Sequence, residues 1–153
     1  MKAKHSLYYY LSSPTATRPT TAHQGDLGID LYASESARLR TGLATLIPTG
    51  VHCIFPEGYG GLIRDRSSMA TKNIIVGGGV IDNGYTGEIK ILLTNLAAFP
   101  AEIEIEPGDK IAQMILLPVV DGAVVHLSEK EFGDMINARN SSRGADGFGS
   151  TGQ

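Results

Sequence analysis

Residues 77–88, with the sequence Gly-Gly-Gly-Val-Ile-Asp-Asn-Gly-Tyr-Thr-Gly-Glu, contain the clearest indication of how this chain folds. The Asn83-Gly84 pair within them is the strongest short signal for a β-hairpin, because both residues tolerate positive φ. A strand-like run, residues 88–94, follows closely. The stretch therefore predicts a tight hairpin, and with it a fold made mainly of strands.

Short strand candidates continue on both sides of this hairpin and are separated by Gly, Pro or other turn residues. Besides 88–94, they cover residues 7–11, 44–47, 51–55, 61–64, 74–76 and 111–117. Residues 101–106, Ala-Glu-Ile-Glu-Ile-Glu, alternate strictly, which predicts a half-buried strand. Even spacing of this kind is typical of a sandwich, jelly roll or barrel. One short helix is expected at about residues 68–73, just after the Ser67-Ser68 pair that could cap it.

The length and composition fit a single all-β domain. The chain has 153 residues, enough to bury a hydrophobic core without disulfides. Its 19 glycines exceed the usual share and indicate many turns. The net charge of −3 argues against broad nucleic-acid binding, which needs a basic surface, and leaves open a small anionic ligand held by a few local cations.

Cys53 is the only cysteine, so an intramolecular disulfide is excluded. It lies in the apolar run 51–55, which favours a buried small hydrophobe over a reactive thiol. The N-terminus has no signal-peptide layout, and no apolar run approaches the length that spans a membrane. We therefore expect a protein of the reducing cytoplasm without a membrane partner.

Residues 137–153 differ from the rest of the chain because they contain almost no apolar side chains. We therefore divide the chain into a β domain, residues 1–136, and a flexible C-terminal arm, residues 137–153. A frayed tail is the simplest interpretation of the arm. Alternatively, Phe148 stacks on a flat ligand and Arg143 grips a phosphate, in which case the arm closes over a ligand as a lid.

The hairpin stretch also offers candidate site residues. Asp82 places a carboxylate just before the turn, and Tyr85 places an aromatic ring just after it. The preceding glycines would allow a ligand to approach the backbone closely. Backbone N–H and C=O groups along the hairpin could then distinguish uracil from cytosine by their donor and acceptor patterns. The alternative is a hairpin with a purely structural role.

Three further positions combine polar groups with structural signals. Arg66, Ser67 and Ser68 lie at the expected helix start and could cradle a phosphate, although a capped helix with solvated arginines is an equally good interpretation. Gln113 is a polar amide inside an apolar strand, so it needs a core hydrogen bond or a contact with water or phosphate. Asp30 alternates with apolar neighbours, and its simplest role is to stabilise a turn.

Taken in order, these segments resemble the five motifs of the dUTPase family. The matching stretches are residues 28–32, 65–70, 79–88, 107–116 and 143–151. Five motifs in register along most of the chain are a specific signature, whereas one alone would be weak. The sequence departs from the commonest pattern at Asp65, where many members have proline, and at Val76, where many have asparagine.

The resemblance implies a distorted jelly-roll-like β-barrel that assembles into a homotrimer with three shared active sites. The second and fourth motifs would come from one subunit, the third from a neighbour, and the arm from the remaining one. The implied reaction converts dUTP and water into dUMP and pyrophosphate, with Mg²⁺ bound to the triphosphate. Such an enzyme limits dUTP and supplies dUMP for thymidylate synthesis.

The resemblance also implies a role for each candidate residue. Asp82 is the base that orients and deprotonates the attacking water, while Tyr85 lies under the deoxyribose and leaves no room for a 2′-hydroxyl. Val80 and Ile81 would line the uracil pocket, and Lys90 would contact the substrate. Phosphate binding is implied for Arg66, Ser67 and Ser68, water or phosphate binding for Gln113, and a water-mediated contact with Mg²⁺ for Asp30. In the arm, Arg143 would bind the γ-phosphate and Phe148 would stack on uracil, with Gly149 beside it in the substrate-binding segment.

Two alternative functions compete with this one. A dCTP deaminase shares the implied fold and a similar hairpin, but the arm sequence Gly-Phe-Gly-Ser at residues 147–150 belongs to the dUTPase pattern. A trimeric binding or regulatory protein that has lost turnover is the second alternative. The presence of Asp82, Arg66, Ser67 and Arg143 favours a working enzyme over such a protein.

Overall fold

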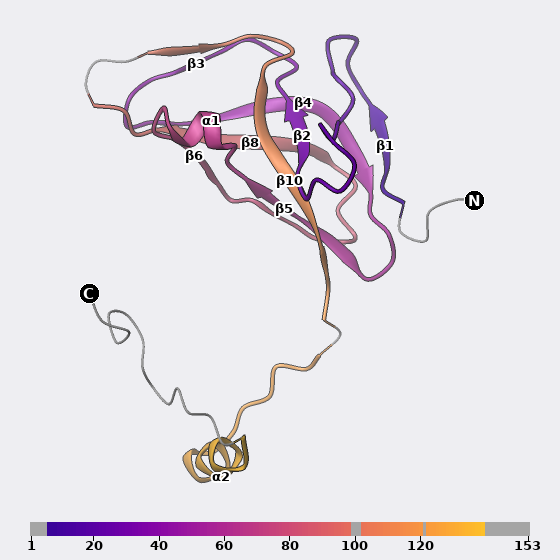
Figure 1. Cartoon of the computed structure of the whole chain (residues 1–153), viewed down its shortest axis with the longest axis vertical. Coiled ribbons are helices and arrows are strands. Elements are labelled where there is room, and N and C mark those ends of the chain that lie inside the picture. Colours follow the sequence, from indigo (N-terminus) through magenta and orange to yellow (C-terminus); the bar gives the residue numbers. More distant parts are fainter. Residues whose placement is uncertain (1–5, 99–101, 121, 140–153) are drawn as a thin grey trace. The chain divides into compact units, whose positions relative to one another are not determined.

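The computed structural model describes residues 6–98, 102–120 and 122–139 (Figure 1). The chain divides into two compact units, residues 1–120 and residues 121–153. The first unit contains β1 (Tyr8–Leu11), β2 (Ile29–Tyr32), β3 (Ala37–Leu39), β4 (Ala44–Ile54), β5 (Tyr59–Arg64), α1 (Ser67–Ala70), β6 (Ile74–Gly77), β7 (Val80–Ile81), β8 (Glu88–Asn95), β9 (Ile103–Ile105) and β10 (Lys110–Pro118). The second unit contains α2 (Glu129–Arg139). Among the described residues, neither helix is long and apolar enough to cross a membrane.

The strands of the first unit form two four-stranded sheets and a two-stranded ribbon. The first sheet has the order β1-β4-β8-β6, the second has the order β2-β10-β5-β7, and the ribbon pairs β3 with β9. Ile47 and Leu93 of the first sheet and Leu31 and Met114 of the second belong to one buried hydrophobic cluster. The two sheets therefore share a core, and the predicted all-β, jelly-roll-like fold is confirmed. Figure 1 shows β10 between β2 and β5, where it pairs on both sides.

Strand β4 is longer than the sequence pattern indicated. We predicted two strands, residues 44–47 and 51–55, whereas β4 continues from Ala44 to Ile54 through Pro48 and Gly50. The pairing with β8 shifts register between Pro48 and His52, as expected where proline removes a ladder donor. Glu88 supports the irregular stretch, because its carboxylate accepts a hydrogen bond from the Gly50 backbone N–H at 2.8 Å. A side chain thus replaces the missing ladder bond and keeps the strand continuous.

The Asn83-Gly84 pair forms a turn, but the predicted tight hairpin is wrong. The Tyr85 backbone N–H donates to the Asp82 carbonyl at 3.1 Å, which closes a β-turn around the pair. Strand β7, however, pairs with β5, while β8 pairs with β4 and β6 in the other sheet. Asn83 explains the difference because its side-chain N–H₂ group donates to the carbonyls of Pro56 and Tyr59, at 2.9 and 2.6 Å. The turn is therefore held against the β4–β5 connection and leads from one sheet to the other.

Helix α1 is shorter than predicted, and the serine pair does not cap it. The residue at the cap position is Arg66, which makes no side-chain capping bond, and Ser67 is the first helical residue. The helix ends at Ala70, and Asn73 then adopts a positive φ of 59°. Asparagine tolerates this left-handed conformation better than most residues, so the chain can turn here into β6.

Helix α2 was not predicted, although its start carries a recognisable signal. Ser128 and Glu131 form a capping box, in which the Ser128 backbone N–H donates to the Glu131 carboxylate at 2.8 Å and the Glu131 backbone N–H donates to the Ser128 hydroxyl at 3.4 Å. Hydrogen bonds from the Ser128 hydroxyl and backbone N–H lower the pKa of Glu131. No residue of α2 is buried. The predicted division of the chain after residue 136 stays a prediction.

Cys53 is buried in the hydrophobic cluster, with 3% of its surface exposed. Burial raises the pKa of its thiol to about 11, so the thiolate is scarce at neutral pH. The interpretation of Cys53 as a buried small hydrophobe is confirmed.

Candidate active site

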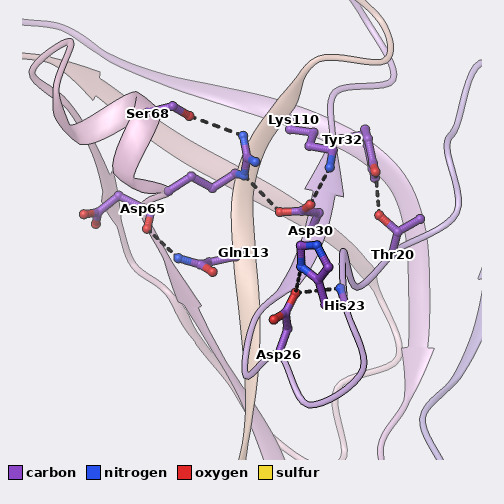
Figure 2. A network of polar contacts seen from close by, with 10 residues as sticks. Thr20, His23, Asp26, Asp30, Tyr32, Asp65, Ser68, Lys110 and Gln113 are labelled. Carbon is purple, nitrogen blue, oxygen red and sulfur yellow. Dashed lines mark hydrogen bonds and ion pairs between the residues drawn. The ribbon is translucent and has the colours of Figure 1, made fainter.

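Asp30 is the centre of a network of charged side chains drawn from three distant parts of the sequence (Figure 2). It lies on β2, and its Oδ1 accepts a hydrogen bond from Arg66 Nε at 2.9 Å. Its Oδ2 accepts one from Lys110 Nζ, at the start of β10, at 2.7 Å. Arg66 also donates through Nη1 to the Ser68 hydroxyl at 3.3 Å. The simplest interpretation of Asp30, a turn-stabilising carboxylate, is therefore wrong, because the residue lies on a strand and its carboxylate pairs two cations.

The burial of Asp30 explains why it has two charged partners. Only 8% of the residue is exposed, and a buried carboxylate is costly unless cations and hydrogen-bond donors pair with it. The pKa of Lys110 is raised, mainly by its hydrogen bond to Asp30. The hydrogen bond thus favours the charged form of Lys110, which keeps a cation beside Asp30. Sequence reasoning missed Lys110, since its partner lies 80 residues away in the chain.

A polar hollow of about 340 Å³, called here the arginine hollow, lies beside this network. Its lining residues are Ala22, Asp26, Leu27, Gly28, Asp30, Arg66, Ser67 and Gln113. Gln113 donates through Nε2 to the Asp65 carbonyl at 3.0 Å, so the amide has the hydrogen-bond partner that its strand position required. A side chain at Gly28 would collide with the Gln113 Oε1 atom, which gives this glycine a packing role.

A second hollow of about 330 Å³, called here the tyrosine hollow, lies beside the Asp82–Tyr85 turn. Its lining residues are Leu46, Val80, Ile81, Asp82, Tyr85, Glu88 and Lys90. Val80 and Tyr85 are 73% and 45% exposed, so the hollow is open to a ligand. The Tyr85 hydroxyl donates to the Glu88 carbonyl at 2.9 Å, which fixes the ring orientation. Lys90 lies 3.6 Å from the carboxylate of Glu88.

The glycines before the turn have a role in packing and backbone conformation. The Ile63 backbone N–H donates to the Gly79 carbonyl at 2.7 Å, and a Cβ at Gly79 would collide with the Ile63 carbonyl. Gly79 therefore has β5 as its close neighbour, and the approach of a ligand to these glycines stays a prediction. Gly78, with a φ of +58°, supplies the left-handed conformation that brings the chain into this position.

The structure divides the predicted site residues between the two hollows. Asp30, Arg66, Ser67 and Gln113 line the arginine hollow, whereas Val80, Ile81, Asp82, Tyr85 and Lys90 line the tyrosine hollow. The two linings share no residue. Ser68 lies in a further hollow between α1 and β9, which Arg66 also lines. Arg143, Phe148 and Gly149 lie outside the described residues.

Sheet topology explains this division. Asp30 is on β2 and the Val80-Ile81 pair is on β7, and these two strands occupy opposite edges of the same four-stranded sheet. The fold thus offers one hollow with cationic and hydroxyl groups and another with a carboxylate and an aromatic ring. These features define the class of the protein: a jelly-roll-like β domain with one hollow lined by Arg66 and Ser67 and a separate hollow lined by Asp82 and Tyr85.

Comparison with known proteins identifies the family within this class. The chain belongs to the dUTPase family, whose model matches residues 15–152. The deoxyuridine 5'-triphosphate nucleotidohydrolase of Mycobacterium tuberculosis (strain ATCC 25618 / H37Rv) is 40% identical over 142 residues, which cover 91% of this chain and 90% of that protein. The enzyme of the same name from Candida albicans is 36% identical over 154 residues, which cover 100% of this chain and 92% of that protein.

Solved structures of similar proteins agree in fold. The dUTPase of Staphylococcus bacteriophage 80alpha with dUpNHpp has a TM-score of 0.81 and 28% identity, over 97% of this chain and 99% of that chain. A mutant dUTPase from phage phi11 of S. aureus has a TM-score of 0.74 and 28% identity, over 83% of this chain and 99% of that chain. That structure describes the coordination of a structural Mg(II) ion.

Proposed function

We propose that this chain hydrolyses dUTP to dUMP and pyrophosphate. Its membership of the dUTPase family supports the overall reaction. The observation that carries the proposed mechanism is the tyrosine hollow, where Asp82 and Tyr85 line one cavity together with Val80, Ile81 and Lys90. This hollow offers a carboxylate, a ring and exposed backbone groups within one space, as hydrolysis at a nucleoside phosphate requires.

In this mechanism, Asp82 accepts a hydrogen bond from a water molecule and holds it in line with the α-phosphorus. As the water oxygen bonds to phosphorus, its proton passes to the Asp82 carboxylate, and the bond between the α-phosphorus and the bridging oxygen breaks. Pyrophosphate then leaves. Tyr85 lies under the deoxyribose, with its ring fixed by the bond to the Glu88 carbonyl. Val80 and Ile81 present backbone groups to uracil, and Lys90 contacts the substrate.

The arginine hollow is proposed to bind the phosphates. Arg66 offers its outer guanidinium nitrogens, and Ser67 offers a hydroxyl group in the same hollow. The Ser68 hydroxyl, in the adjoining hollow, is proposed to help hold the phosphates beside Arg66. Gln113 anchors its Nε2 on Asp65, which leaves Oε1 to accept a hydrogen bond from water. Charge neutralisation and positioning of this kind supply most of the acceleration in phosphoryl transfer, because the protein takes little part in bond making.

Mg²⁺ is proposed to accompany the triphosphate, whose charge it would neutralise. Within the described residues, no group of three His, Cys, Asp or Glu side chains could hold a metal. Asp30 already pairs with Arg66 and Lys110 through its two oxygens. Each oxygen retains acceptor capacity for a water molecule, so a water-mediated contact fits Asp30, whereas a direct bond would displace one of the cations.

The separation of the two hollows supports the proposal of a homotrimer with shared sites. Asp82 and Arg66 must act on the same triphosphate, yet they line two hollows that share no residue, one beside β2 and the other beside β7 and β8. A second copy that places its arginine hollow against the tyrosine hollow of the first would complete each site. The arm, residues 137–153, would then close over it. Cytoplasmic location and the absence of nucleic-acid and membrane partners stay predictions.

Mixing two inactive variants tests the shared site. Arg66→Ala and Asp82→Asn are each expected to lose activity as pure oligomers, because every site lacks one group. When they are unfolded and refolded together, about a quarter of the sites should combine an intact Asp82 with an intact Arg66 from different subunits. Pyrophosphate release should recover to about that fraction of the wild-type rate. No recovery, despite mixed oligomers in native mass spectrometry, would place both residues of a site in one chain.

A pyrophosphate-release assay tests the proposed function directly. The wild-type chain is expected to turn over dUTP and to leave UTP, dCTP and dTTP unchanged, since Tyr85 blocks the 2′-hydroxyl and the turn rejects other bases. Release of ammonia from dCTP would instead identify a deaminase. Binding of dUTP without pyrophosphate release would identify a binding protein that has lost turnover.

A further inference from the structure

Arg66 is held in a geometry that leaves part of its guanidinium group available. Its Nε donates to Asp30 and its Nη1 donates to Ser68, at 2.9 and 3.3 Å. Neither bond uses Nη2. Arg66 lines both the arginine hollow and the hollow beside α1, so its side chain borders space that a ligand can occupy. This geometry depends on Asp30 engaging Arg66 through a single nitrogen.

Lys110 explains why Asp30 engages only Nε. The most favourable pairing of arginine with carboxylate is bidentate, with two parallel hydrogen bonds to the two oxygens. In this chain, Lys110 Nζ lies 2.7 Å from Asp30 Oδ2, so a guanidinium nitrogen that approached the same oxygen would meet a second positive charge. Without Lys110, a carboxylate that is 8% exposed would lose one of its two cations, and the guanidinium could turn to bind both oxygens.

Lys110 is itself held in place by its surroundings. Its Nζ lies 5.7 Å from the centroid of the Tyr32 ring, within the range of a cation–π contact. The Tyr32 hydroxyl is 2.6 Å from the Thr20 hydroxyl, which anchors the ring (Figure 2). Two cations and one carboxylate give the cluster a net charge of +1, which suits an anionic ligand.

We propose that Lys110 is a positioning residue for phosphate binding: it occupies one oxygen of Asp30 and so keeps the outer nitrogens of Arg66 free for a triphosphate. The inference rests on the proposed function, because the ligand is the triphosphate of dUTP. Lys110 acts through Asp30 and Arg66 and does not touch the reacting atoms. A purely structural role, in which Lys110 only neutralises Asp30, would affect stability and leave ligand affinity unchanged.

The test compares Lys110→Met, which keeps the length of the side chain without its charge, with Lys110→Arg, which restores the cation. Lys130→Met, the loss of an exposed lysine that lines neither the arginine hollow nor the hollow beside α1, is the control. Lys110→Met should weaken binding of dUpNHpp and raise KM for dUTP by about tenfold, with a smaller change in kcat. Inhibition by deoxyuridine, which has no phosphates, should change less than about twofold, since it needs none of these contacts. Lys110→Arg should recover most of the affinity.

A double-mutant cycle with Arg66→Ala separates positioning from general charge effects. If Lys110 acts through Arg66, Lys110→Met should have no further effect on dUpNHpp affinity in the Arg66→Ala background. Should Lys110→Met fail to fold, Lys110→Ala, which also removes the donor but leaves space for water beside Asp30, replaces it in the same cycle.

Two results would overturn the proposal and are distinguishable. Unchanged dUpNHpp affinity in Lys110→Met, or an equal loss in both backgrounds of the cycle, refutes the positioning role while the proposed function stands. A wild-type chain that neither binds dUpNHpp nor hydrolyses dUTP refutes the proposed function, and the positioning role fails with it.

Discussion

Replacement of Asp82 by asparagine is expected to lower kcat for dUTP by about a hundredfold to ten-thousandfold, the usual contribution of a general base. Asparagine has the same shape and can still bind a water molecule, but it cannot accept the proton. The lining of the tyrosine hollow is otherwise preserved, so affinity for dUpNHpp should change little. Steady-state kinetics and calorimetric titration of the variant measure the two quantities.

Glu57→Gln is the matched control for this variant. Glu57 is an exposed carboxylate on the β4–β5 connection that Asn83 contacts, so the variant removes a nearby negative charge outside both hollows. It should retain the wild-type kcat. A kcat for Asp82→Asn within about threefold of the wild-type value would exclude Asp82 as the base, because general-base catalysis contributes much more than that.

Removal of residues 143–153 is the second change with a large expected effect. If the arm closes the site, the shortened chain loses the Arg143 donor and the Phe148 ring at once. Loss of one preorganised donor to a developing charge typically costs about a hundredfold or more in rate, so dUTP turnover should fall at least that far. Among the residues that the structure describes, the hydrophobic core lies entirely before residue 121, and the thermal unfolding transition should therefore keep its temperature. A chain that ends at Thr151 serves as the control and should remain active, whereas full activity of the shorter chain would exclude a lid.

Most strands of the fold could be predicted from the sequence because their side chains alternate or form apolar runs between turn residues. Strands β8, β9 and β10 are examples, and each lies within about two residues of its predicted range. Strand β2 was missed because it has only four residues and its aspartate was interpreted as a turn residue, although Asp30 alternates with apolar neighbours. Strand β3, with three residues, is too short to show a period. The start of helix α2 carries a recognisable capping box at Ser128. The rest of the helix has only a weak amphipathic pattern, as expected for a helix with no buried residue.

The candidate site was harder to predict because its residues depend on contacts between distant segments. The Asn83-Gly84 signal correctly indicates a turn, but a local sequence does not say that the flanking strands belong to different sheets. The motif resemblance identified Asp30 and Arg66 as site residues. Their ion pair could not be predicted, because it depends on how the fold brings β2 next to the start of α1. Lys110 follows the Pro-Gly-Asp turn and reads as an ordinary solvated lysine until its distance from Asp30 is known.

The central position of β10 restricts how this enzyme can be redesigned. Gln113 and Lys110 lie on a strand that pairs with neighbours on both sides, and Ala112 and Met114 on the same strand are fully buried. A slip of one residue would exchange core and site positions together, so directed evolution has little freedom there. Val80 and Tyr85, by contrast, are exposed and lie beside a turn tethered by a single asparagine. Libraries that seek a new base preference should therefore vary this turn and leave the strand untouched.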